Sequence, residues 1–231
     1  MSTLYIVATP IGNLEDITIR AIKTLNAVDL VLCEDTRVTK KLLDRHNIHT
    51  PTLSYHNRST PARVEQIMAM IKEGKTLALV SDAGTPGISD PGSELVRRAR
   101  VEFAERIENG ELRIEAIPGP SALTAAISIA GIPTTDFTFL GFMPHKKGRE
   151  TLFKEMAASE CTTIFYESPH RILKTLAALT KYLDSEKRVI VCRELTKVFE
   201  ELVSGKPEEV KNYFEAHKDK IRGEIVVIVA K

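Results

Sequence analysis

Two carboxylates lie in a glycine- and proline-rich loop, "SDAGTPGISDPG" (residues 81–92), whose composition suits ligand binding. Asp82 directly follows an apolar run, and Asp90 precedes a helical pattern that begins near Ser93. Such carboxylates can bind a metal ion, accept hydrogen bonds from a sugar hydroxyl or backbone amides, or cap a helix. Their spacing matches no calcium loop, and no His or Glu lies between them, so we expect no metal. Asp82 is the candidate for a ribose or amide contact, whereas Asp90 has helix capping as an equal alternative.

A second turn, "ATPIGN" (residues 8–13), lies between an apolar run and a helical pattern, where a phosphate-binding turn would lie. It lacks the G-x-G-x-x-G pattern and the Lys-Ser/Thr ending of a P-loop. A dinucleotide or a nucleoside triphosphate is therefore poorly supported, and a tight turn without a ligand remains an alternative. In the 81–92 loop, by contrast, Gly84, Gly87 and Gly92 would let the main chain approach a flat ligand closely.

Three clusters of mixed charge each follow an apolar, strand-like run and could support acid–base chemistry. They are Glu34, Asp35 and Arg37 in "EDTR", Glu167, His170 and Arg171 in "ESPHR", and Arg193, Glu194 and Lys197 in "RELTK". A carboxylate or histidine can take a proton from a nucleophile, and a nearby cation stabilises the resulting charge. Each cluster can also be read as a helix cap or an ion pair. Their shared position favours a substrate site lined by Glu34, Arg37, Glu167, Arg171, Glu194 and Lys197, without identifying the base.

A basic segment, "PHKKGRE" (residues 144–150), concentrates His145, Lys146, Lys147 and Arg149. Lysine and arginine neutralise phosphates and make binding salt-dependent, so this is the candidate RNA-contacting segment. A solvated basic turn is the alternative.

These residues follow a regular alternation of strand and helix patterns. The strand-like apolar runs lie at residues 4–10, 29–36, 52–57, 76–84 and 112–120. The helical patterns that follow them lie at residues 17–28, 38–47, 61–74, 93–107 and 121–131. Pro61 is suited to the first turn of the third helix. This alternation predicts an α/β domain with a mainly parallel sheet over residues 1–117. The polar turns follow the carboxyl ends of the strands, where such sheets bind ligands.

The pattern changes in the second half, where strand-like runs outnumber helical ones. We expect strands within 136–144, 162–169, 188–195, 197–205 and 223–231, and hence a second α/β domain with a mixed sheet over residues 118–231.

Bulk properties restrict the function further. The formal net charge of the 231 residues is +1, so a nucleic-acid partner must be bound by a local basic patch. Cys33, Cys161 and Cys192 lack metal-binding spacing and suggest structural thiols in a reducing compartment. Neither a signal peptide nor an apolar run of membrane-spanning length is visible, so we expect a cytoplasmic protein without a membrane partner.

Taken together, "LYIVATPIGNLEDIT", "EDTR", "LVSDAGTPGISDPG", "PGPSA", "GFMP", "FYESPHR" and "RELTK" resemble the 16S ribosomal RNA 2′-O-methyltransferase I family, in the tetrapyrrole-methylase-like superfamily. The resemblance runs from Leu4 almost to Lys231. It implies a two-domain α/β homodimer that binds S-adenosylmethionine (SAM) in an interdomain cleft. The implied reaction is 2′-O-methylation of a cytidine ribose in the decoding region of 16S ribosomal RNA, on the 30S subunit.

The same resemblance implies which residues contact SAM. Pro10, Gly12, Asp82, Ala83, Gly84 and Ile88 would contact it from the first domain, with Ser121 and Ala122 beneath it. Phe165, Tyr166 and Glu224 would close over it from the second domain. A cofactor cradle of this kind needs no metal.

Two other functions remain alternatives. The superfamily also includes SAM-dependent methylases of corrin or porphyrin precursors, but these would be expected to show a glycine-richer first loop and "SGDP" where this chain has "SDAG". A non-enzymatic, ribosome-associated or SAM-sensing module would bind SAM without turnover.

Overall fold

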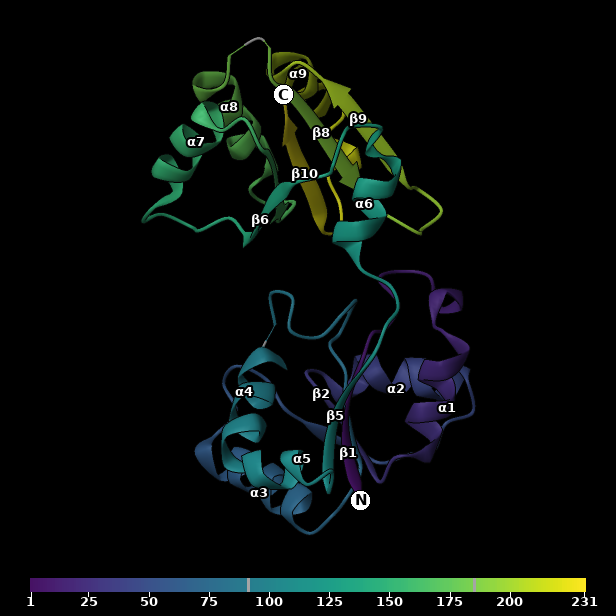
Figure 1. The fold of residues 1–231 in the computed structure, drawn as a ribbon. Coiled ribbons are helices and arrows are strands. Elements are labelled where there is room, and N and C mark those ends of the chain that lie inside the picture. The colour runs from purple at the N-terminus through teal and green to yellow at the C-terminus, as the bar shows by residue number, and fades with distance from the viewer. Residues whose placement is uncertain (91, 185) are drawn as a thin grey trace. The chain divides into compact units, whose positions relative to one another are not determined.

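The computed structural model describes residues 1–90, 92–184 and 186–231. Pro91, in the loop of residues 81–92, lies outside the described residues. The chain divides into two compact units, Met1–Ser121 and Ala122–Lys231 (Figure 1). Each unit contains one β-sheet with its own helices.

In the first unit, the described residues form a five-stranded sheet in the order β3-β2-β4-β1-β5, with every neighbouring pair parallel. The strands are β1 (Ser2–Val7), β2 (Leu30–Cys33), β3 (Thr52–Ser54), β4 (Leu77–Leu79) and β5 (Leu112–Ile117). The connecting helices are α1 (Ile19–Ala27), α2 (Thr36–Arg45), α3 (Pro61–Lys72), α4 (Gly92–Glu102) and α5 (Ala104–Glu108), with a 3-10 turn at Leu14–Asp16. The predicted parallel α/β architecture is confirmed.

Two buried clusters explain why the strands of this unit are apolar throughout. Successive side chains of a strand point to opposite faces of the sheet. One face packs against α1 and α2, as Val31 does with Leu25 and Leu42, and the other packs against α3 and α4. A parallel sheet covered on both faces in this way needs continuous apolar strands rather than alternating ones.

The helices of the first unit begin at side-chain caps. Thr18, Asp35 and Thr60 each accept a hydrogen bond from a backbone N–H in the first turn of α1, α2 and α3. Pro61 opens α3, as predicted, because its fixed φ suits a helix start and no hydrogen bond is lost there. These caps set where each strand-end loop stops.

The described residues of the second unit form a mixed five-stranded sheet in the order β6-β7-β10-β8-β9. β6 (Phe137–Phe142) and β7 (Thr162–Glu167) are parallel, whereas β10 (Ile225–Ala230) is antiparallel to both β7 and β8 (Arg188–Arg193), and β9 (Glu201–Gly205) is antiparallel to β8. The helices are α6 (Ala122–Ala130), α7 (Arg149–Ala158), α8 (Ile172–Tyr182) and α9 (Pro207–Ala216), with a 3-10 turn at Lys218–Lys220. The predicted mixed sheet is confirmed.

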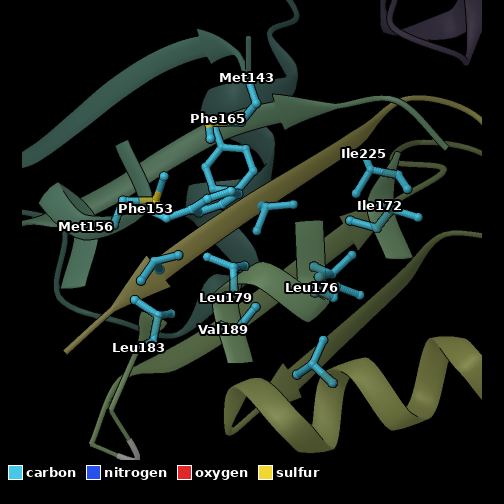
Figure 2. Close-up of a cluster of buried hydrophobic side chains, with 14 of the residues drawn as sticks. Met143, Phe153, Met156, Phe165, Ile172, Leu176, Leu179, Leu183, Val189 and Ile225 are labelled. Atoms are coloured by element: carbon cyan, nitrogen blue, oxygen red, sulfur yellow. The ribbon is translucent and has the colours of Figure 1, made fainter. Parts of the chain in front are cut away.

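The core of the second unit joins β7, β8 and β10 to α7, α8 and α9. Figure 2 shows the ring of Phe165 beside Met143 and Phe153, with Leu176 and Leu179 of α8 packed below. Phe165 is fully buried, so its side chain belongs to this core.

Two cysteines lie in the cores of the two units. Burial raises the pKa of the Cys33 and Cys192 thiols, to about 12 for Cys192, so both stay protonated at neutral pH. Across the described residues, the helices are too short or too polar to span a membrane.

Candidate functional site

The loops after β1 and β4 are joined by backbone hydrogen bonds at the carboxyl edge of the first sheet. Thr9 N–H donates to the Gly84 carbonyl at 2.9 Å, and Gly84 N–H donates to the Thr9 carbonyl at 3.0 Å. The buried Thr9 hydroxyl also donates to the Ser81 carbonyl at 3.1 Å, while the Ser81 hydroxyl lies 3.2 Å from the Gly84 carbonyl. The glycine loop is therefore held by side chains from two strand ends.

The loop after β5 completes this junction. The Thr85 hydroxyl donates to the Pro120 carbonyl at 3.1 Å. Gly84 has φ +85°, and a Cβ there would lie 3.4 Å from Ile11 Cγ2 and 3.8 Å from the Pro120 carbonyl. A side chain at Gly84 would therefore be strained and would project into the space where the three loops meet.

The two loop carboxylates bind backbone amides. Asp82 is exposed, and its Oδ1 accepts from the Asp35 N–H at 3.0 Å, which ties the β4 loop to the β2 loop. Asp90 Oδ1 accepts from the N–H groups of Gly87 and Gly92, each at 2.7 Å, and so closes the loop onto the first residue of α4. Within the described residues, no three His, Cys, Asp or Glu side chains are grouped as a metal site requires.

The "EDTR" cluster forms a helix cap with an ion pair. Asp35 caps α2, and its Oδ2 lies 2.6 Å from Arg37 Nη2. Hydrogen bonds from the Arg37 side chain and backbone lower the pKa of Asp35 to about 2, and the hydrogen bond to the Asp35 carboxylate raises the pKa of Arg37. Glu34 is half-buried, and Arg37 remains 88% exposed at this edge of the sheet. Asp35 thus acts as a helix cap and ion-pair partner, which was the structural alternative for this cluster, whereas the guanidinium of Arg37 faces solvent.

Glu167 in "ESPHR" is fully buried between two arginines. Its Oε1 lies 2.7 Å from Arg171 Nη2, and its Oε2 lies 2.8 Å from Arg149 Nη2. The Thr175 hydroxyl lies 2.6 Å from Oε2, and the Ser168 N–H donates to Oε1 at 2.8 Å. Both carboxylate oxygens are therefore occupied by internal donors, which favours a structural role for Glu167.

The "RELTK" cluster forms a compact turn after β8. Lys197 Nζ lies 2.9 Å from Glu194 Oε1, and Glu194 and Thr196 adopt positive φ values of 51° and 66°. A Cβ on Gly223 would lie only 2.1 Å from Glu194 Oε1, so this glycine, in the segment "RGE" (residues 222–224), lets the two segments meet. The structure thus brings Glu194 and Lys197 to the residue before Glu224.

Arg193 belongs to a different network. Its Nε donates to Glu201 Oε2 at 2.7 Å, and Glu201 Oε1 accepts from Lys220 Nζ at 2.6 Å and from the Tyr213 hydroxyl at 2.5 Å. Burial opposes ionisation of Glu201, but these hydrogen bonds outweigh it and lower its pKa to about 2. The network joins β8, β9 and α9.

This network makes stability depend on pH. Because the folded pKa of Glu201 is about 2 and its ordinary value is 4.5, its contribution is present above pH 4.5 and is lost as the pH falls towards 2. We expect Glu201→Gln to lower the free energy of unfolding by about 1–2 kcal/mol at pH 7 and by much less at pH 3. Urea unfolding at both pH values measures this, with the surface variant Glu215→Gln as control; an equal loss at both would contradict the assignment.

The remaining predicted residues differ in exposure. Gly12, Ala83 and Glu224 are exposed, Pro10 is buried, and Ile88, Ser121, Ala122 and Tyr166 are half-buried, whereas Phe165 is in the core. His145, Lys146 and Lys147 are exposed, as an RNA contact requires, but the side chain of Arg149 is only 16% exposed. Sequence reasoning missed Thr9 and Thr175, since single threonines carry little signal until their partners are known.

Comparisons with known proteins agree with the fold and identify the family. Residues 3–211 match the tetrapyrrole (corrin/porphyrin) methylases. The structures of the methyltransferase CobJ and of uroporphyrin-III-C-methyltransferase from Thermus thermophilus align with TM-scores of 0.70 and 0.65 at 18% and 17% identity. Each alignment covers 100% of this chain and 95% of the other, and at such identity it shows the shared fold alone.

Relatives of much higher identity carry a different name. The ribosomal RNA small subunit methyltransferase I of Thermotoga maritima is 45% identical over 230 residues, which cover 100% of this chain and 99% of the relative. The protein of the same name from Escherichia coli O157:H7 is 42% identical, over 98% of this chain and 77% of the relative. The chain therefore belongs to the ribosomal RNA small subunit methyltransferase I family, within the tetrapyrrole (corrin/porphyrin) methylases.

Proposed function

We propose that this protein uses SAM to methylate the ribose 2′-oxygen of a cytidine in the decoding region of 16S ribosomal RNA, on the assembled 30S subunit. Such an enzyme acts in the cytoplasm, where ribosomes assemble, and we propose that it does so as a homodimer. The observation that carries the proposal is the loop junction at Gly84, in a chain 45% identical over its full length to a ribosomal RNA methyltransferase.

The residues at that junction fit the proposed cofactor. Gly84 keeps the meeting point of three loops free of a side chain, so main-chain groups can face a flat adenosine or an extended methionine. Asp82 is exposed and held in place through Asp35, and a carboxylate is a suitable acceptor for ribose hydroxyls. We assign Pro10, Gly12, Ala83 and Ile88 to the same surface, since they flank these groups in the two loops.

Methyl transfer to a ribose hydroxyl requires mainly that the reacting groups are aligned and that the charge developing on the oxygen is stabilised. When bound, SAM supplies an electrophilic methyl group on a sulfonium sulfur. The protein has to position the 2′-hydroxyl in line, exclude water and favour loss of the hydroxyl proton. Arg37 and Lys197 present exposed or partly exposed cations that would stabilise a developing alkoxide. We assign Glu34 and Glu194 as candidate bases, and Glu167 and Arg171 to support of the site.

Methylation of a tetrapyrrole is the weaker alternative. The macrocycle enzymes share the fold at 17–18% identity, whereas the ribosomal RNA methyltransferases reach 45%. A tetrapyrrole methylase would be expected to transfer methyl to a macrocycle and to ignore RNA.

The proposal is tested by transfer of labelled methyl from SAM to undermethylated 30S subunits, compared with naked 16S RNA. Alkaline hydrolysis follows, because a 2′-O-methyl group blocks cleavage of the adjoining phosphodiester. We expect label in an alkali-resistant dinucleotide and stronger transfer to 30S subunits. Label in a base or in neither RNA, with SAM binding intact, would contradict the proposal.

A further inference from the structure

We propose that Arg149 is a positioning residue: with Glu167 and Arg171 it fixes the main chain of residues 143–148, so that His145, Lys146 and Lys147 are presented to RNA while Arg149 itself binds no phosphate. This inference rests on the proposed function, and it reassigns one of the four basic residues that the sequence groups together.

The guanidinium of Arg149 is already occupied inside the protein. Nη2 lies 2.8 Å from Glu167 Oε2 and also donates to the Thr175 hydroxyl, while Nη1 donates to the Pro144 carbonyl at 2.9 Å. The group also lies over the ring of Phe153, 5.4 Å from its centroid, and Phe153 is buried. A phosphate would have to replace a carboxylate that Arg149 holds in a largely dry site.

Arg171 repeats this arrangement on the other oxygen of the same carboxylate. Its Nη2 lies 2.7 Å from Glu167 Oε1, and its Nη1 donates to the Met143 carbonyl at 2.8 Å. Two guanidinium groups therefore extend from one buried anion to two consecutive carbonyls, those of Met143 and Pro144. Planar guanidinium groups make such two-sided contacts with defined geometry, which a lysine would not reproduce.

The main chain of this segment is fixed at both ends. Met143 is buried beside Phe165 (Figure 2), and its N–H donates to the Tyr166 carbonyl at 3.3 Å. At the other end, Arg149 N–H donates to the Lys146 carbonyl at 3.2 Å, and Gly148 has φ +82° at the start of α7. The three residues between Pro144 and Gly148 are nevertheless exposed. A held main chain with free cationic side chains reduces the entropy lost when RNA binds.

The two roles predict different salt dependence. Each phosphate neutralised by a protein cation adds about 0.9 to the magnitude of the slope of log K against log salt for duplex, and about 0.7 for a single strand. Removing a direct contact lowers the slope, whereas removing a positioning residue weakens binding with an unchanged slope, provided that the lysines still reach their phosphates.

The experiment measures binding of undermethylated 30S subunits over a range of potassium chloride concentrations. We expect Lys146→Ala and Lys147→Ala each to lower the slope magnitude by about 0.7–0.9. Arg149→Met, which retains an unbranched apolar stem, should weaken binding roughly 3–10-fold with little change of slope, as expected for about 1 kcal/mol of lost preorganisation. Arg149→Lys should not restore binding, because one ammonium cannot hold both Glu167 and the Pro144 carbonyl.

A second measurement needs no RNA. The backbone amides at positions 143 and 149 donate to the Tyr166 and Lys146 carbonyls, and their hydrogen exchange should become faster in Arg149→Met and stay unchanged in Lys146→Ala. Thr175→Val keeps all charges and should give a smaller increase in the exchange rate. It replaces Arg149→Met in this measurement if Arg149→Met does not fold. If Arg149→Met lowered the salt slope and left the exchange unchanged, the proposal would be overturned in favour of a direct phosphate contact. If Arg149→Met changed neither binding nor exchange, the positioning role would be wrong. If wild-type protein shows no salt-dependent binding to 30S subunits, the proposed function fails, and the exchange data still decide the positioning role.

Discussion

Gly84→Val is expected to lower SAM affinity by on the order of 100-fold, about 2.7 kcal/mol, while the protein stays folded. Gly84 has φ +85°, which a β-branched residue adopts only with strain, and its Cβ would enter the meeting point of the β1, β4 and β5 loops. Valine methyl groups would extend beyond a Cβ that already lies 3.4 Å from Ile11 Cγ2. Isothermal titration with SAM measures the loss directly.

A matched control separates backbone strain from the loss of the binding surface. Gly74 has φ +87°, and a Cβ there would meet nothing within 4 Å. Gly74→Val therefore introduces similar strain in the turn before β4, away from the loop junction, and SAM affinity should stay within about twofold of wild type. If Gly84→Val bound SAM normally, or if Gly74→Val lost binding equally, the assignment of the loop as the cofactor cradle would be wrong.

Glu167→Gln is expected to destabilise the protein by about 3 kcal/mol, because it leaves two largely buried guanidinium groups without their shared anion. Domains of this size are stable by only about 5–15 kcal/mol, so the denaturant midpoint should fall sharply. Urea unfolding followed by circular dichroism measures the change. A catalytic carboxylate would behave in the opposite way, with activity lost and stability nearly unchanged.

Glu160→Gln is the control for this prediction. Glu160 pairs with Lys231, but both side chains are more than 70% exposed and the pair is screened by solvent, so the denaturant midpoint should hardly change. If Glu167→Gln proves too unstable to purify, Thr175→Val removes one hydrogen bond to Glu167 and should cost about 1 kcal/mol. If Glu167→Gln and Thr175→Val were both as stable as the wild type, the structural role of Glu167 would be excluded and Glu167 would again be a candidate base.

The fold could be predicted because its signals are local. Runs such as "LYIV" and "LVLC" are apolar along their whole length, which parallel strands covered on both faces require, and the helices between them carry caps at Thr18, Asp35 and Thr60. The order of the strands in each sheet could not be predicted in this way. Nothing in the local sequence places β4 between β1 and β2, or β10 between β7 and β8, because those pairings depend on contacts between distant residues.

The position of the glycine loops could be predicted for the same local reason, since turns at the carboxyl ends of parallel strands share one edge of the sheet. Their joining by Thr9 and Gly84 could not, because the two residues are 75 positions apart and their bonds are between backbone groups that every sequence possesses.

For charged residues, types and spacing alone determined a set of candidates, and the tertiary structure decided their roles. "PHKKGRE" presents four basic side chains that look equivalent in the sequence, and "ESPHR" places an acid four positions before an arginine. Only the folded chain shows that Arg149 and Arg171 converge on the buried Glu167 while Lys146 and Lys147 remain in solvent. Strand and helix patterns arise from residues that are neighbours in the chain. Burial and charge pairing depend instead on contacts between residues that are distant in the sequence. A charged side chain that is buried and paired in this way has a structural role and is not available to bind a ligand.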